Sequence, residues 1–324
     1  MTLDQKERVS LNSIGRIFAI FAGIVTGILL PLVRQSLGGW ATTVIVLSIL
    51  SAAMMIPMCL FAKERVIERE KARDGGAEEN YTLRDMVECL RSNKYLLIFF
   101  AAPLISSLLN IGATWGLYIA RYCLGGEEIA SFVSMAVIVP TLIGAAIAVQ
   151  LCKKYDKFKI FYFSYMFALI LGIVRYIAGY ENMMVYVILN ALGGFPLGIA
   201  AILQYQFTPD CYEYGQYKTG LKMRGVTFAA QTFFTKLNGA IATAVSVFAL
   251  TLIGFKEGEG VIQAAGFADK LWTFSCLGSI IGGIGTLLIL RLYKLNDHDV
   301  QLMSKCNNGE ITREEAEAQM INRY

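Results

Sequence analysis

Eight long apolar segments dominate the chain, and none of them contains an aspartate or a glutamate. A helix needs roughly 20 apolar residues to cross the ~30 Å hydrocarbon core of a bilayer. Segments of about this length or longer occupy residues 14–33, 40–62, 95–122, 129–151, 158–180, 183–207, 226–255 and 271–293. Barrel strands are about half as long and alternate in polarity. The sequence therefore predicts an all-α, polytopic membrane protein with eight transmembrane helices.

Composition agrees with this fold class and limits the chemistry. Hydrophobic residues make up 56% of the 324 residues and charged residues only 17%, unlike a soluble domain. Residues 1–13 are polar with balanced charges, so we expect no cleavable signal peptide before the first span. The seven cysteines form no CxxC pair and His298 is the only histidine. We expect no disulfide framework, no metal site and no cofactor.

The basic residues indicate the orientation of the helices. Of the 29 lysines and arginines, 22 lie in the starting segment, in alternate loops (63–94, 153–159, 218–224) and in the tail from residue 291. The other four loops hold four, and three lie inside spans. Such asymmetry marks the cytoplasmic face, so we expect both termini in the cytoplasm and a multi-pass protein of the inner (plasma) membrane. Orientation also accounts for the positive charge, so nucleic acid is not an expected partner.

Two segments outside the spans have helical patterns. In the loop 63–94, residues 63–80 are charged and predict a flexible linker, whereas residues 81–92 place apolar residues at helical intervals. We interpret 81–92 as a short amphipathic helix on the membrane surface; a merely solvated charged helix is the alternative. In the tail, Thr312 and Glu315 predict a capping box within a soluble cytoplasmic extension.

Lys236 lies near the middle of the segment 226–255, ten or more residues from either end. A cation in hydrocarbon costs at least about 2.5–3.5 kcal/mol. A lysine stem is too short to bring its ammonium to an interface from that depth. Since no span supplies a carboxylate, we expect Lys236 to face a polar cavity in which a solute or another protein segment carries the negative charge.

Further polar residues suit the same cavity. Thr232 lies one helical turn before Lys236, and we expect Gln231 on about the same face. Trp115 and Gln204 belong to spans interrupted by proline or paired glycines, which occur where helices bend around a cavity, although helix packing also explains them. Amides and cations bond sugar hydroxyls while an aromatic ring stacks on the sugar C–H face. The set predicts a sugar-binding lining.

Arg16 is a further candidate binding residue within the spans, which hold no catalytic motif. Arg16 stands near the cytoplasmic end of the first span, where an anchoring role at the headgroups explains it as well as a binding role does. The spans hold no HExxH motif, no carboxylate pair and no Ser/His arrangement. We therefore do not expect an enzyme.

Residues 207–225 combine an aspartate, a Tyr-Gly pair and a Lys-Thr-Gly element ahead of the segment that holds Lys236. This pattern closely resembles the glycoside-pentoside-hexuronide:cation symporters, the melibiose-carrier branch of the major facilitator superfamily. In that family a lysine at the position of Lys236 helps to form the polar centre. The resemblance implies a cytoplasmic gate or loop role for six residues: Asp210, Glu213, Tyr214, Gly215, Lys218 and Arg224.

Two further stretches extend the resemblance over essentially the whole chain. Residues 2–19 are similar to the family's loop between its fourth and fifth helices and align Arg16 with a sugar-contacting arginine; residues 90–96 match more weakly before helix seven. The chain then corresponds to helices five to twelve, a partial major-facilitator fold. The divisions are 1–62 (last two helices of the N-terminal bundle), 63–94 (middle loop), 95–294 (complete six-helix C-terminal bundle) and 295–324 (cytoplasmic tail).

The resemblance implies a secondary active transporter for sugar or glycoside:cation symport by alternating access, coupled to Na⁺ or H⁺. By this alignment the cation-binding carboxylates of the family lie upstream, so we expect an N-terminally incomplete carrier or one that needs a missing N-terminal segment. The expected partners are a small-molecule sugar and the lipid bilayer. The alternative is a non-transporting membrane relic or a sugar-binding sensor. The expected substrate-binding residues are Arg16, Lys236, Thr232, Gln231, Trp115 and Gln204.

Overall fold

The computed structural model describes residues 14–15, 18–19, 21–23, 40–61, 83–109, 112, 114–126, 128–222, 224–257 and 261–324. The chain forms two compact units, Met1–Asn80 and Tyr81–Tyr324, each of which is considered by itself. The first unit contains α2 (Trp40–Phe61), in agreement with the predicted span 40–62. Many of its apolar side chains are exposed, including Ile45 and Ile49, as expected for a helix that faces lipid.

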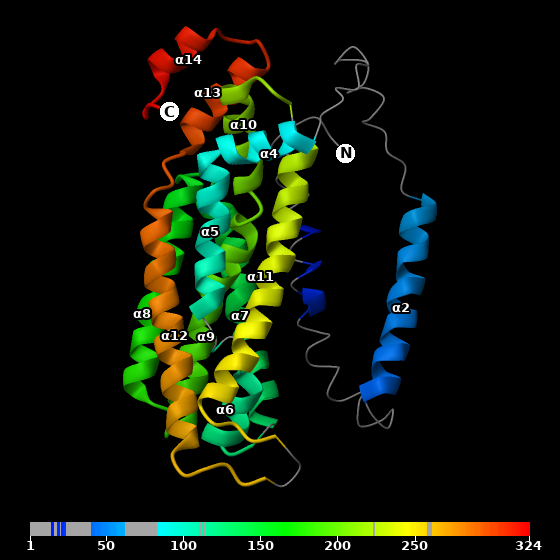
Figure 1. Ribbon diagram of the computed structural model, residues 1–324, viewed down its shortest axis with the longest axis vertical. Helices are drawn as coiled ribbons and strands as arrows, with labels where there is room; N and C mark the ends of the chain where they lie inside the picture. The colour runs from blue at the N-terminus through cyan, green and yellow to red at the C-terminus, as the bar shows by residue number, and fades with distance from the viewer. Residues whose placement is uncertain are drawn as a thin grey trace. The chain divides into compact units, whose positions relative to one another are not determined.

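The described part of the second unit is helical, without a strand. Its helices are α4 (Leu83–Ser92), α5 (Lys94–Leu109), α6 (Gly116–Cys123), α7 (Glu128–Leu151), α8 (Lys157–Ala178), α9 (Met183–Leu203), α10 (Phe207–Thr219), α11 (Arg224–Leu252), α12 (Phe267–Leu290), α13 (Asp297–Asn307) and α14 (Arg313–Gln319). Figure 1 shows the long helices side by side, with α4, α10, α13 and α14 gathered at one end, called here the α10 end, and α6 at the other.

Five described helical stretches are long and apolar enough to cross a membrane: Ile129–Leu151, Lys157–Ala178, Met183–Thr219, Arg224–Leu252 and Phe267–Leu290. The all-helical membrane fold is thus confirmed, but the count of eight spans is not. The predicted span 95–122 is divided into α5 and α6, and Trp115 starts the second piece as its N-cap. Most of the predicted span 14–33 lies outside the described residues.

The closest packing in the bundle joins α7 to α9 through glycines. A Cβ atom on Gly198 would lie 2.0 Å from the Thr141 carbonyl oxygen, and one on Gly144 would lie 2.3 Å from the Phe195 oxygen. Without side chains at these positions the two backbones touch, which strengthens dispersion contacts inside a membrane where hydrophobic exclusion from water is absent. Gly198 of α9 and Gly144 of α7 therefore serve helix packing, the alternative to a bend around a cavity.

Two clusters of buried apolar residues fill the unit, one toward each end. The cluster at the α10 end is aromatic: Phe99, Phe161, Phe207 and Tyr293 pack with ring centroids 5.0–6.5 Å apart. The cluster toward α6 contains Trp115, Leu271 and Trp272. Aromatic pairs at these separations stabilise a core beyond the area they bury.

Candidate functional site

Lys236 lies near the middle of the 29-residue helix α11, and its side chain is exposed. Among the described residues, no carboxylate lies within the 4.0 Å ion-pair distance of its ammonium. The buried residues of α11, such as Ala230 and Ser246, lie on a different face of the helix. At mid-depth of a membrane-spanning helix, the second unit therefore presents a cation that none of its described carboxylates compensates.

Two of the residues about one turn away from Lys236, Thr232 and Gly239, are small. Thr232 is exposed, and its hydroxyl donates to the Phe228 carbonyl oxygen of the same helix at 3.1 Å. On the other side, a Cβ atom on Gly239 would meet nothing within 4 Å. A lysine flanked by a threonine and a glycine on an exposed face leaves room for a polar ligand beside its ammonium. This surface of Thr232, Lys236 and Gly239 is called the Lys236 face.

Gln231 does not share the Lys236 face. Its side chain is 8% exposed, whereas that of Lys236 is exposed. Five residues at 3.6 residues per turn place the two side chains about 140° apart around the helix. The expectation that they lie on about the same face is therefore wrong.

Trp115 and Gln204 belong to other elements than the Lys236 face. Trp115 is fully buried, and its indole N–H donates to the Ser246 carbonyl oxygen at 3.3 Å, so this ring ties the start of α6 to α11. Gln204 is half-buried in the turn between α9 and α10. The structure thus places Thr232 beside Lys236 on the exposed face of α11 and buries Gln231 and Trp115. Arg16 lies outside the described residues.

Five of the six predicted gate residues lie in a helix. Residues 207–219 make up α10, which follows α9 after a short turn and belongs to the same 37-residue apolar stretch. Buried residues recur along it at helical spacing, including Phe207, Cys211 and Tyr214. The polar residues between them made this segment resemble a cytoplasmic loop in the sequence.

Asp210 of α10 takes part in an ion cluster. Its carboxylate lies 2.9 Å from the Lys157 ammonium at the start of α8, and Lys157 also lies 3.2 Å from Asp297 of α13. The Lys157 and Asp210 side chains are only 19% and 11% exposed. One buried cation therefore joins three helices, and two carboxylates balance it.

Tyr214 and Gly215 of α10 pack against the junction of α4 and α5. Asn93 at this junction is 2% exposed, and its amide donates to the Cys211 carbonyl oxygen at 2.6 Å. A Cβ atom on Gly215 would lie 2.8 Å from the same amide nitrogen. Lys218 donates to the Ser92 carbonyl oxygen at 3.1 Å. These contacts hold α4 and α5 against α10.

Glu213 faces the opposite side, toward the tail. It accepts a hydrogen bond from the Asn307 amide at 2.9 Å, which ties α10 to the end of α13. Arg224 begins α11, with its guanidinium 5.9 Å from the ring centre of Phe228. The predicted gate residues therefore link α4, α5, α10 and α13, while Arg224 stands at the start of α11.

The tail is docked on the bundle and is not a solvated extension. The carboxylate of Asp299 is fully buried and accepts hydrogen bonds from the Ile321 and Asn322 backbone N–H groups and from the Tyr324 hydroxyl, at 2.7–3.1 Å. Burial raises the pKa of this carboxyl, but these bonds outweigh it and leave the pKa below its ordinary value. The predicted capping box of Thr312 and Glu315 is confirmed in α14.

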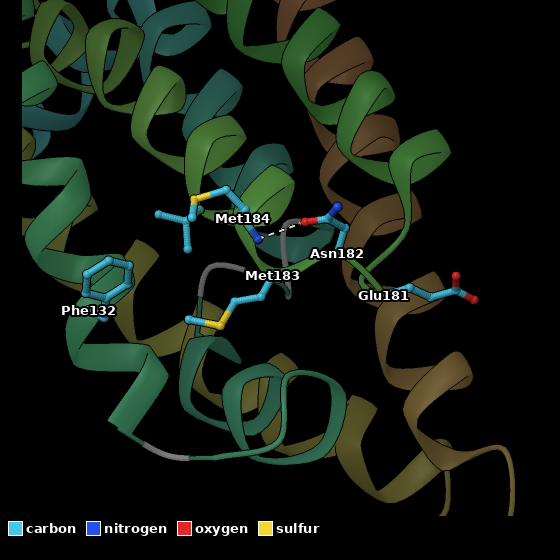
Figure 2. A pocket seen from close by; sticks show the side chains of 6 residues that line it. Phe132, Glu181, Asn182, Met183 and Met184 are labelled. Atoms are coloured by element: carbon cyan, nitrogen blue, oxygen red, sulfur yellow. Dashed lines mark hydrogen bonds between the residues drawn. The ribbon is translucent and has the colours of Figure 1, made fainter.

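Two cavities lie at opposite ends of the unit, away from the Lys236 face. Figure 2 shows the one near α6, a shallow apolar pocket of about 420 Å³ whose lining includes Phe132, Met183 and Met184. There the Asn182 side chain accepts from the Met184 backbone N–H and caps α9. The other cavity, about 600 Å³, lies at the α10 end. In the described part of the chain, no group of His, Cys, Asp or Glu side chains has a metal-binding arrangement.

Sequence reasoning missed Lys157, Asp297 and Asp299. Their signals are weak in the sequence. Lys157 belongs to a basic segment that the positive-inside rule explains, and the two aspartates belong to a polar tail that simple solvation explains. The asparagine before Asp297 and Asp156 before Lys157 are helix-capping residue types, which could have identified the starts of α13 and α8.

Comparison with known proteins gives a consistent set of relatives. The family described as MFS/sugar transport protein matches residues 1–297. The putative glycoside/cation symporter YagG of Escherichia coli (strain K12) is 24% identical over 316 residues, which are 94% of this chain and 66% of the relative. The uncharacterized symporter YnaJ of Bacillus subtilis (strain 168) is 25% identical over 280 residues, 82% of this chain and 58% of the relative.

A third relative, the inner membrane symporter YicJ of Escherichia coli (strain K12), is 22% identical over 309 residues, 93% of this chain and 65% of the relative. The chain therefore spans between 58% and 66% of the length of these curated relatives.

Proposed function

Because the chain belongs to the MFS/sugar transport family, we propose that it acts as a secondary active transporter that carries a sugar or glycoside together with Na⁺ or H⁺. The family consists of transporters, not enzymes. We place the protein in the inner membrane, with both termini in the cytoplasm. Names of symporters among the relatives support the transport class, while the substrate and the coupling ion belong to the proposal.

The observation that carries the proposal is the exposed ammonium of Lys236 on a face lined by Thr232 and Gly239. A cation at mid-depth persists when it faces a polar cavity, and an ammonium donates up to three hydrogen bonds. Sugar hydroxyls accept such bonds. We therefore assign the Lys236 face to the substrate path, with Arg16 as a second donor.

Alternating access requires two bundles that rock around a site at mid-depth. The helices of the described bundle are held together at the α10 end. Asn93 joins α4 and α5 to α10, and Lys157 joins α8 to Asp210 of α10 and to α13. If the gene product has helices before Met1, as the family resemblance implies, they would supply the carboxylate that faces Lys236.

The test is uptake of a panel of labelled glycosides, pentosides and hexuronides by membrane vesicles under an imposed Na⁺ or H⁺ gradient, with the full-length gene product. Lys236→Ala should abolish gradient-driven accumulation while membrane insertion is unchanged. Lys305→Ala, which removes an exposed lysine of the tail, serves as the control and should transport normally. Normal accumulation by Lys236→Ala would remove this lysine from the mechanism.

Arg16→Ala and binding measurements separate the remaining alternatives. Arg16→Ala should weaken sugar binding because its guanidinium offers paired donors to hydroxyls; unchanged binding would return Arg16 to an anchoring role. Sugar binding without uptake under any gradient would instead support the sensor, and neither binding nor uptake would support the relic.

A further inference from the structure

The cavity at the α10 end lies where three membrane-spanning helices reach the membrane surface. It is a recess of about 600 Å³ between the α7 to α8 loop and the segment that joins α12 to α13. Helix α7 ends at Leu151, α8 begins at Lys157 and α12 ends at Leu290. Because these helices cross the hydrocarbon, residues just beyond their ends lie at the depth of phospholipid headgroups.

Four lysines and a histidine line the recess from both walls. Lys153, Lys154 and Lys159 come from the α7 to α8 loop and the start of α8, while Lys294 and His298 come from the opposite wall. All five side chains are exposed. Among the described residues, no carboxylate lies within 4.0 Å of any of the four lysine ammonium groups.

The two carboxylates that line the recess are already committed to the protein. Asp156 accepts from the Phe158 and Lys159 backbone N–H groups, which caps α8, and from the Asp297 backbone N–H at 2.8 Å. Asp297 accepts from the Lys157 backbone N–H at 3.0 Å and lies 3.2 Å from its ammonium. Neither acid neutralises the lysines, so the recess attracts an anion.

An apolar surface continues from the recess along the bundle. Helices α8 and α12 pack against each other, with Gly283 close to the Leu169 side chain. Below the recess, Phe163 of α8 is 60% exposed, and Leu288 and Leu292 at the end of α12 are 58% and 60% exposed. A soluble phosphate ester would leave this surface unused, whereas the acyl chains of a lipid would cover it.

We propose that the recess binds the phosphate headgroup of an anionic phospholipid, with its acyl chains along α8 and α12. Basic pockets between transmembrane helices bind such headgroups. The four lysines supply the charge, while the two lining acids are engaged by backbone N–H groups and by Lys157. The bound lipid would stabilise the ion cluster of Lys157, Asp210 and Asp297. Lys157 and Asp297 directly follow the α7 to α8 loop and the α12 to α13 segment, which form the walls of the recess.

Native mass spectrometry of the purified full-length protein tests the site, with phosphatidylglycerol titrated against phosphatidylcholine. The wild type should retain phosphatidylglycerol preferentially. Lys159→Gln/Lys294→Gln should weaken that retention roughly tenfold, since each lysine near the membrane surface strengthens the attraction for an anionic lipid. The matched control is Lys256→Gln/Lys270→Gln, which removes two exposed lysines from the opposite end and should bind as the wild type does.

Two further arms make each result decisive. Lys159→Arg/Lys294→Arg keeps the charge and should restore binding, which separates lost charge from damaged folding. Inorganic phosphate at millimolar concentration should not displace the lipid. Equal retention of both lipids by the wild type, equal retention of phosphatidylglycerol by the Gln variant, or its full displacement by phosphate would overturn the proposal.

Discussion

The ammonium of Lys157 lies 2.9 Å from the carboxylate of Asp210, so one buried ion pair joins the start of α8 to the first turn of α10. Asp297 of α13 approaches the same ammonium from a third helix. A lysine shared by two acids tolerates partial burial because its charge is balanced where water is scarce. The ion pair therefore holds α8 and α10 together at the place where the tail begins.

Asp210→Asn should destabilise the second unit by about 3 kcal/mol, because it leaves the buried Lys157 with only one acid. Thermal unfolding in detergent, followed by size-exclusion fluorescence, should show a fall in Tm of roughly 5–10 °C. Glu314→Gln removes an exposed carboxylate of α14 and is the control, for which we expect no measurable change. A Tm for Asp210→Asn equal to that of the control would contradict a structural role for the cluster.

Gly198→Ala should loosen the contact between α7 and α9. The added methyl group would lie 2.0 Å from the Thr141 carbonyl oxygen, and backbone moves less readily than a side chain. We expect a loss of about 3 kcal/mol, at the upper end of overpacking effects. Gly193→Ala on the same helix is the matched control, because its new methyl group would meet nothing within 4 Å. It should be neutral or stabilising by up to about 1 kcal/mol; equal Tm values for the two variants would refute the contact.

The long apolar helices were predictable from the sequence because hydrophobic length alone specifies them. The predicted segments 129–151, 158–180 and 271–293 differ from α7, α8 and α12 by only a few residues at each end. The resemblance to sugar symporters was likewise confirmed, since it depended on a long motif in residues 207–225.

Elements whose burial depends on tertiary contacts were not predictable in the same way. Helix α10 contains aspartate, glutamate and lysine, so hydropathy could not separate it from a loop. Its helical nature follows from the spacing of Phe207, Cys211 and Tyr214, which only neighbouring helices bury. The position of the last residues of the tail depends on Asp299, which accepts hydrogen bonds from Ile321 and Asn322, more than 20 residues further along the chain. No local pattern specifies such a contact.

The candidate site shows the same division. The depth of Lys236 in its span was readable from sequence, and the structure adds that its side chain is exposed on α11. Trp115 was misplaced because an aromatic residue near a helix break suits a sugar platform and a packed core equally well. Its fully buried ring and its hydrogen bond to the Ser246 carbonyl oxygen show that it belongs to the packed core.

Tyr324→Phe should weaken docking of the tail. The hydroxyl of Tyr324 donates to Asp299 at 2.7 Å, and burial together with this bond raises the pKa of the phenol. Loss of the bond should cost about 1 kcal/mol. Limited proteolysis should then cut the tail roughly fivefold faster. Tyr176→Phe removes a partly exposed phenol on α8 and is the matched control; equal cleavage rates in the two variants would contradict the contact.

Docking of the tail should also depend on pH through Asp299. Because its folded pKa is lowered, the carboxylate stabilises the docked tail fully above the ordinary aspartate value of about 3.9, and the stabilisation is lost as pH falls through the lowered value. Amide hydrogen exchange, corrected for its intrinsic pH dependence, reads this directly, since the Ile321 and Asn322 amides donate to the carboxylate. Both should be protected at pH 7 and exchange freely in acid.

Asp299→Asn separates this carboxylate from general acid unfolding. The carboxamide brings an N–H donor toward two N–H donors and a hydroxyl, so the Ile321 and Asn322 amides should lose protection already at pH 7, while amides of α8 keep theirs. Glu314→Gln, an exposed change in α14, should leave the profile of the tail as in the wild type. Wild-type protection of both amides in Asp299→Asn would show that apolar packing of α13, not its buried charge, holds the tail.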